Sequence, residues 1–119
     1  MHEIEGLVDS LLASWQRSGS LIHGRRWHRI PYSKTISVTA LDERSEEPVS
    51  EPIVATGQDV SLGGIAFAHS QAVPQRLVAV TFDLLDGSSE SIVTALKWCR
   101  FGRDGRYRSG GRFLRAFTH

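Results

Sequence analysis

The sequence predicts an all-β protein: a six-stranded antiparallel β-barrel preceded by one N-terminal α-helix. The chain has 119 residues and a mass of 13.2 kDa, which is the size of one domain. After residue 32, polar and apolar residues alternate in short runs, and Gly-containing turn signals separate several of these runs. A closed barrel leaves no exposed strand edge, which suits a core drawn from only 40% hydrophobic residues.

A single amphipathic helix is expected over residues 3–16. Its apolar residues recur at the spacing that places them on one helix face, and they are Ile4, Leu7, Val8, Leu11, Leu12 and Trp15. Glu3 and Glu5 lie in its first turn, where the helix dipole favours anions. We assign residues 1–20 to this helix and expect it to cap the barrel core. A dimerisation helix is the alternative.

Strands are expected after the helix. The predicted runs are 33–40, 51–58, 64–68, 76–84, 90–100 and 106–117. Asp86-Gly87 and Asp104-Gly105 predict tight hairpin turns, because Gly readily adopts the positive φ that such turns require. Residues 42–48 carry mostly charged side chains and predict an exposed loop.

Composition excludes several classes of protein. The net charge of +1, from 14 basic and 13 acidic residues, argues against a protein that binds polyanions over its whole surface. The single cysteine, Cys99, cannot form an internal disulfide. No apolar stretch reaches the roughly 18 residues of a membrane span. Glu3, Glu5 and Asp9 stand where a signal peptide is basic, so we expect a cytoplasmic protein.

Two polar clusters are candidates for a binding site. The first contains Arg25, Arg26 and Arg29, in the segment 21–32 that we assign to an arginine-rich, ligand-binding linker. Three arginines within five residues repel one another unless an anion neutralises them, although a solvated basic linker is the alternative. The planar guanidinium suits both phosphate groups and flat rings.

The second cluster is Asp59-Val60-Ser61-Leu62-Gly63-Gly64, beside an expected strand. Side chains two residues apart on a strand share a face, so Asp59 and Ser61 offer a carboxylate and a hydroxyl to the edge of a flat heterocycle. Gly63 and Gly64 let the chain turn and let a ligand approach the backbone. The alternative is a structural Asx or Ser turn between two strands.

Taken in order, the two clusters make the chain resemble the PilZ domain family. That family carries an Arg-x-x-x-Arg motif, which is matched here by Arg25 to Arg29. It also carries an Asp/Asn-x-Ser-x-x-Gly motif, which is matched by Asp59 to Gly64. Each motif is short, but their order and their separation of about 30 residues make the combination specific.

A weaker family feature supports the same resemblance. An aromatic strand followed by Gly-x-x-Phe is matched by residues 93–98 and 110–113. The resemblance covers residues 24–117. It implies a single PilZ-like domain over residues 21–119, with the barrel at 33–119.

The resemblance implies a receptor for cyclic di-GMP, a bacterial second messenger with two phosphodiesters and two guanines. Arg25 and Arg29 would bind phosphate and guanine, while Asp59 and Ser61 would hold the second motif around a guanine. Gly64 would permit the turn. The remaining expected contacts are Arg26, Gly63, Trp98, Arg108 and Arg112.

We therefore predict a receptor, not an enzyme, that uses no cofactor, changes conformation on binding cyclic di-GMP and signals through a partner protein. No His-Glu-x-x-His pattern occurs, and Ser61 lacks the Gly-x-Ser-x-Gly frame of a nucleophile. One alternative is a PilZ-like adaptor that binds protein without nucleotide. A less favoured alternative is a basic barrel that binds single-stranded nucleic acid, since residues 97–119 hold seven basic residues against Asp104.

Overall fold

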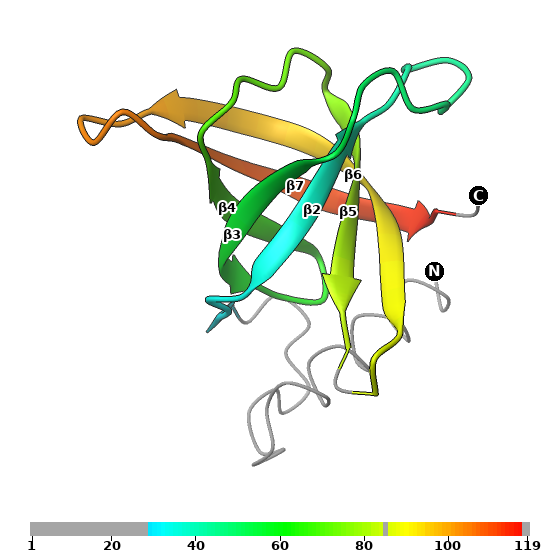
Figure 1. Ribbon diagram of the computed structural model, residues 1–119, viewed down its shortest axis with the longest axis horizontal. Helices are drawn as coiled ribbons and strands as arrows, with labels where there is room; N and C mark the ends of the chain where they lie inside the picture. The colour runs from blue at the N-terminus through cyan, green and yellow to red at the C-terminus, as the bar shows by residue number, and fades with distance from the viewer. Residues whose placement is uncertain (1–28, 85, 118–119) are drawn as a thin grey trace.

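The structure is a computed structural model that describes residues 29–84 and 86–117 (Figure 1). The predicted helix at 3–16 lies outside the described residues, as do Arg25 and Arg26. Within the described part, all regular structure is β. The strands are β1 (Ile30–Pro31), β2 (Thr35–Ala40), β3 (Ile53–Val60), β4 (Gly64–His69), β5 (Leu77–Asp83), β6 (Ser89–Phe101) and β7 (Tyr107–Ala116).

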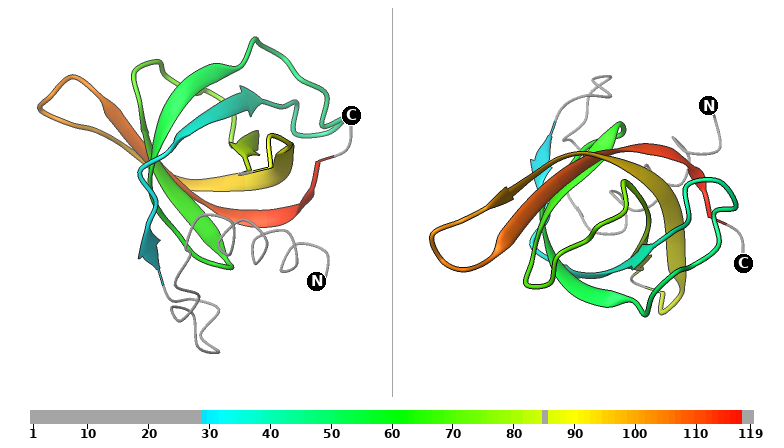
Figure 2. Two further views of the ribbon diagram at one scale, coloured as in Figure 1. Left: turned by 60° about the horizontal axis from the view of Figure 1, so that its bottom comes forward. Right: turned by 90° about the horizontal axis from the view of Figure 1, so that it is seen from above.

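Six of these strands form a closed antiparallel barrel, as the sequence predicts. The order around the ring is β3-β2-β5-β6-β7-β4, and the pairing of β4 with β3 closes it (Figures 1 and 2). The ends of each of the six strands lie within two residues of the predicted ends. Closure satisfies the backbone of β3 and β4, which would otherwise be the two edges of an open sheet.

The two-residue strand β1 was not predicted, because it falls inside the segment expected to be a linker. Ile30 pairs with Val60 and Pro31 with Asp59, so β1 extends the barrel wall beside the end of β3. The next residue, Tyr32, is buried, and its backbone N–H donates to the carbonyl of Gln58 at 3.0 Å. The end of the linker is therefore part of the barrel.

Period-two burial builds the core. Along β2, the apolar side chains of Ile36, Val38 and Ala40 are buried and alternate with more accessible polar ones. Aromatic rings fill the centre of the barrel, where Phe82 meets Phe113 edge to face with ring centroids 6.2 Å apart. Tyr32 meets the same ring at 5.9 Å. Such pairs add to the burial energy of the rings, so Phe82 anchors the interior.

Both predicted hairpin turns are confirmed. Gly87 and Gly105 have φ values of 88° and 79°, in the left-handed region that a residue with a Cβ rarely adopts. The preceding aspartates stabilise the turns, since Asp86 accepts the N–H of Ser88 at 2.9 Å and Asp104 accepts that of Arg106 at 3.1 Å. These turns join β5 to β6 and β6 to β7.

A buried histidine lies at the end of β4. His69 Nδ1 donates to the carbonyl of Gln71 at 2.7 Å, and its Nε2 accepts from the Ser109 hydroxyl at 2.8 Å. The carbonyl of Gln71 can only accept, so Nδ1 carries a proton, and in the neutral ring Nε2 then accepts from the Ser109 hydroxyl. Burial lowers the pKa of His69 most, the hydrogen bond to Gln71 raises it, and the charge of Arg106 lowers it further.

We expect Phe82→Ala to lower the free energy of unfolding by about 3–5 kcal/mol, because it removes the central ring and leaves a cavity. The matched control is Val54→Ala on β3, where the side chain is 73% exposed and the expected change is within about 0.5 kcal/mol. Urea unfolding followed by circular dichroism measures both. Equal losses in the two variants would contradict this assignment of the core.

The lowered pKa of His69 predicts weaker folding in acid. Because the native state disfavours the protonated ring, its contribution is complete above about pH 6.5, the ordinary pKa of histidine, and declines as the pH falls below that value. We expect the urea midpoint to drop more between pH 7.5 and pH 5.5 in the wild type than in His69→Gln. NMR titration of the wild-type ring gives an independent check, and a pKa above 6.5 would contradict the prediction.

Candidate functional site

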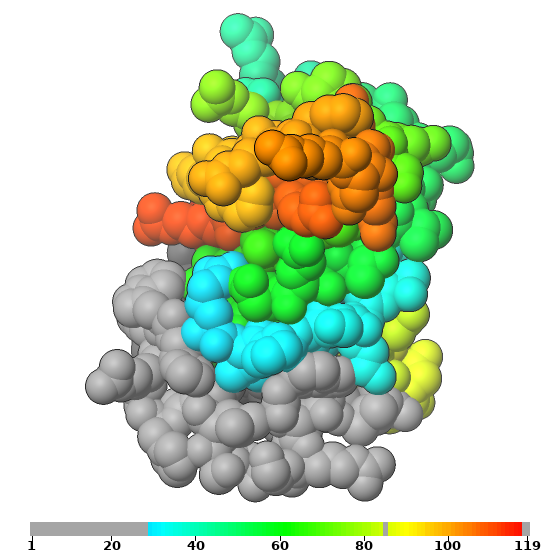
Figure 3. Space-filling view, turned by 90° about the vertical axis from the view of Figure 1, so that its left-hand side faces the viewer, coloured from blue at the N-terminus to red at the C-terminus, as the bar shows by residue number. Residues whose placement is uncertain are grey.

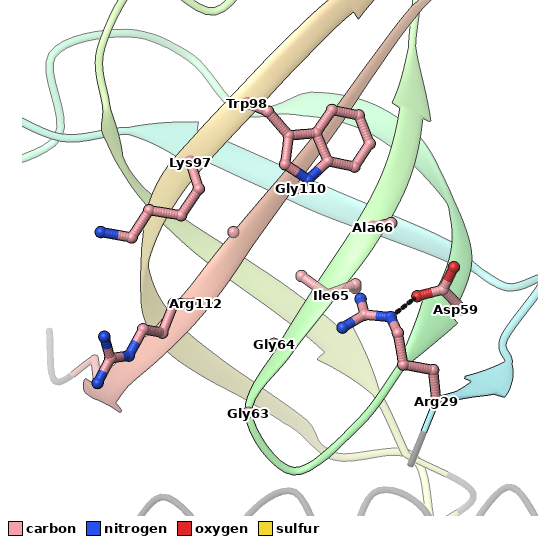
Figure 4. Close-up of a pocket in the computed structure, with 11 residues that line it drawn as sticks. Arg29, Asp59, Gly63, Gly64, Ile65, Ala66, Lys97, Trp98, Gly110 and Arg112 are labelled. Atoms are coloured by element: carbon pink, nitrogen blue, oxygen red, sulfur yellow. Dashed lines mark hydrogen bonds and ion pairs between the residues drawn. The ribbon is translucent and has the colours of Figure 1, made fainter. Parts of the chain in front are cut away.

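A groove of about 470 Å³ lies on the outer wall of the barrel, where β3, β4, β7 and β6 are neighbours. Its lining residues are Arg29, Asp59, Gly63, Gly64, Ile65, Ala66, Lys97, Trp98, Gly110, Gly111 and Arg112 (Figure 4). The volume lies within the range of small-molecule sites in proteins. Six of the predicted site residues therefore line one groove: Arg29, Asp59, Gly63, Gly64, Trp98 and Arg112.

An ion pair forms one side of the groove. Arg29 Nε donates to Asp59 Oδ1, although the two residues are 30 positions apart in sequence. The pairing of Pro31 with Asp59 brings the segment before β1 alongside the end of β3. A register shift between Gly57 and Asp59 then places Asp59 opposite Ala66. A β-bulge changes the direction in which the following side chains point. Here the bulge lies directly before Asp59, whose carboxylate lies on the groove.

Both partners of this ion pair remain accessible to a ligand. The side chain of Arg29 is 46% exposed and that of Asp59 is 37% exposed. Arg29 bonds to Asp59 through Nε, and among the described residues no acceptor is found for the outer nitrogens of the fork, which can donate to a ligand. The ion pair can therefore offer a ligand both hydrogen-bond donors, from the Arg29 guanidinium, and acceptors, from the Asp59 carboxylate.

The floor of the groove is made of small residues. A Cβ at Gly64 would lie 2.1 Å from the carbonyl oxygen of Gly111, and one at Gly110 would lie 2.4 Å from the indole of Trp98. Glycine is thus required at Gly64 for the close approach of β4 to β7. This corrects the expectation that Gly64 permits a turn, since it lies in β4 and its φ is not positive.

The opposite side of the groove carries an aromatic ring and two cations. A second register shift, between Leu96 and Trp98, makes Lys97 the extra residue of a bulge in β6. The indole of Trp98 lies over Gly110 and is 41% exposed. The guanidinium of Arg100 lies 5.3 Å from the centroid of this indole, at cation–π distance. Lys97 and Arg112 extend from neighbouring strands on this side (Figure 4).

The groove carries a net positive charge. Of the described residues that line it, Arg29, Lys97 and Arg112 are cationic and Asp59 is the single anion, which leaves a net charge of +2. Cationic groups around a partly enclosed site favour anionic ligands. The arrangement therefore suits a doubly charged ligand with a flat ring system.

Ser61 is placed in the turn and not on the groove. Its side chain is buried, and its hydroxyl accepts the N–H of Gly63 at 3.1 Å. Its own N–H donates to the carbonyl of Gly64 at 2.9 Å. These bonds shape the turn that supports the neighbouring glycines, which is the structural alternative raised for this motif. Ser61 thus acts on the site by positioning the β3–β4 connection.

Arg108 also lies outside the groove lining. Its guanidinium donates to Asp104 at 2.8 and 3.3 Å, at the far end of the β6–β7 hairpin. The hydrogen bonds from Arg108, followed by that from the Arg106 N–H, lower the pKa of Asp104 to about 2. Arg108 is therefore not a groove-lining residue, although the strand register places it on the same face of the hairpin as Trp98.

Sequence reasoning missed several lining residues. It did not single out Lys97, Ile65, Ala66, Gly110 or Gly111 as site residues, although the Gly110-Gly111 pair was a visible signal of close strand contact. Lys97 lines the groove because of the bulge in β6, and no local sequence pattern predicts that bulge.

Among the described residues there is no helix long and apolar enough to cross a membrane.

Comparisons with family models, with curated proteins and with solved structures find no match to this chain. Its function must therefore be argued from the groove and from the residues that line it.

The close approach at Gly64 gives a direct test of the groove floor. We expect Gly64→Ala to lower the free energy of unfolding by about 1–3 kcal/mol, because the new methyl group meets the backbone of β7 and the strands must separate. Gly102→Ala is the matched control and should lower the free energy of unfolding less than Gly64→Ala. A Cβ at Gly102 would lie 2.5 Å from the end of the Arg108 side chain, which can move aside. A Gly64 variant as stable as wild type would contradict the inferred contact.

Proposed function

We propose that the groove binds cyclic di-GMP and that the protein is a receptor for this dinucleotide. The observation that supports the proposal best is the groove itself. It combines the Arg29–Asp59 pair, a floor without bulky side chains, an accessible indole and a net charge of +2. Cyclic di-GMP carries two negative charges and two flat guanines. The PilZ-like motifs in the sequence support the same ligand.

Each side of the groove matches a part of this ligand. The guanidinium of Arg29 is a fork that suits guanine O6 and N7 or a phosphate, and Asp59 can accept from the guanine N1 and N2 donors. Trp98 offers a ring on which a base can stack. Lys97 and Arg112 add positive charge to the groove, which favours a phosphodiester, and their side chains extend away from the Arg29–Asp59 pair (Figure 4).

Binding is expected to redistribute the existing ion pair. Arg29 donates to Asp59, and a guanine that bonds to both would replace part of that contact. The predicted output is a change in the segment before β1, transmitted to a partner protein. Under this proposal the site performs no chemistry on the ligand, and the protein acts in the cytoplasm.

Single-stranded nucleic acid is the second candidate ligand. It is favoured by two exposed aromatic residues on β6, Trp98 and Phe101, with Arg100 between them. A nucleotide-independent adaptor would leave the Arg29–Asp59 pair without a ligand role.

Calorimetric titration with cyclic di-GMP, GTP and a short oligonucleotide separates these functions. We expect Arg29→Ala and Asp59→Ala each to weaken cyclic di-GMP binding about 10- to 100-fold, which corresponds to the loss of a charged hydrogen bond worth about 1.5–3 kcal/mol. Arg112→Ala should also weaken it. Arg108→Ala is the matched control and should leave the affinity unchanged, since Arg108 lies outside the groove.

The result that overturns the proposal is an absence of heat with cyclic di-GMP at high micromolar concentration. Oligonucleotide binding that falls steeply with salt would instead favour the second candidate. Binding of cyclic di-GMP that Arg29→Ala and Asp59→Ala leave intact would place the ligand elsewhere on the protein.

A further inference from the structure

The β6–β7 hairpin continues beyond the barrel wall. We call residues 97–108 the hairpin arm. In Figures 1 and 2 this gold-to-orange segment projects away from the ring of strands, and Figure 3 shows it standing above the green β3–β4 face. Every residue from Lys97 to Phe101 is exposed, in contrast to the buried and half-buried positions from Glu90 to Leu96 on the same strand.

The arm is held in a defined orientation. Arg108 and Arg106 both bond to Asp104 across its turn, and the Gly102 N–H donates to the Arg106 carbonyl at 2.8 Å. At its base, the ring of Tyr107 stacks on the buried ring of His69 with centroids 5.4 Å apart. Preorganised surfaces bind partners at a lower entropic cost.

One edge of the arm has no neighbouring strand among the described residues. Pairing of β6 with β5 ends at Ala95, and the last bond on that side runs from the Leu96 N–H to the Arg76 carbonyl at 2.7 Å. Backbone groups alternate between the two edges of a strand. Because Gly102 bonds inward to β7, the N–H and C=O groups of Cys99 and Phe101 face the open edge.

Side chains along this edge are apolar and basic. Phe101 is 65% exposed, although its ring makes a T-shaped contact with that of Tyr107, with ring centroids 4.9 Å apart. The arm contains five basic residues against the single acid Asp104, which gives it a net charge of +4. Such a charge disfavours pairing of two copies edge to edge, and it attracts an acidic partner.

We propose that the hairpin arm docks an extended, acidic polypeptide segment of a partner protein, which adds as a strand along Lys97–Phe101. Main-chain hydrogen bonds to Cys99 and Phe101 would supply the register, and acidic side chains would face Arg100 and Arg103. The open backbone edge favours a peptide over a nucleic acid, which would use the charges and rings but not the edge. This inference does not depend on ligand binding in the groove.

The probe is a capped ten-residue peptide of alternating glutamate and valine, titrated without nucleotide at low salt and followed by fluorescence anisotropy. We expect Arg100→Glu and Phe101→Ala each to weaken binding at least about tenfold. Arg44→Glu makes the same charge change at an exposed position outside the arm and should alter the affinity less than about twofold. Circular dichroism verifies that each variant is folded.

Amide hydrogen exchange tests the strand addition itself. With the peptide bound, exchange at Cys99 and Phe101 should slow, whereas exchange at Arg44 should not change. The proposal is overturned if the peptide does not bind, if Arg44→Glu weakens it as much as Arg100→Glu, or if the two arm amides keep their free exchange rates. It is also overturned if an oligo-dT of ten nucleotides binds the arm and displaces the peptide. Because no cyclic di-GMP is present, none of these outcomes bears on the groove.

Discussion

The pairing of β4 with β3 is the contact on which the rest of this structure depends, because it closes the ring. Without it the sheet would end in two unpaired edges, and the apolar faces of both strands would be open to water. The same pairing carries the register shift that sets Asp59 opposite Ala66. Closure of the barrel and placement of the candidate site are therefore one structural event.

The groove is formed where the regular barrel is interrupted. The bulges in β3 and β6 direct the side chains of Asp59 and Trp98 toward the groove. Between them, the glycines of β4 and β7 have no side chains that would fill the groove. Arg29 joins this arrangement only because β1 pairs with the end of β3. The irregular positions of the barrel therefore shape the groove.

The groove and the hairpin arm meet at Lys97 and Trp98. These residues form one side of the groove and also begin the exposed part of β6. Before Lys97, β6 is paired with both β5 and β7, whereas from Trp98 to Phe101 it is paired with β7 alone. Two surfaces of different chemistry are thus continuous: a groove suited to a doubly charged dinucleotide and an edge suited to an acidic strand.

The sequence by itself determined the barrel strands and both glycine turns, because alternating burial and positive φ are local requirements that a few neighbouring residues express. It also predicted that Arg29 and Asp59 belong together. Only the tertiary structure decided that Ser61 supports a turn, that Gly64 serves strand packing and that Arg108 pairs with Asp104. The packing at Gly64 depends on contact between strands distant in sequence, which leaves no local pattern. The bonds of Ser61 and Arg108 are local, to Gly63 and Asp104, but the sequence offers these side chains equally to a ligand, and the folded geometry decides which partner they take.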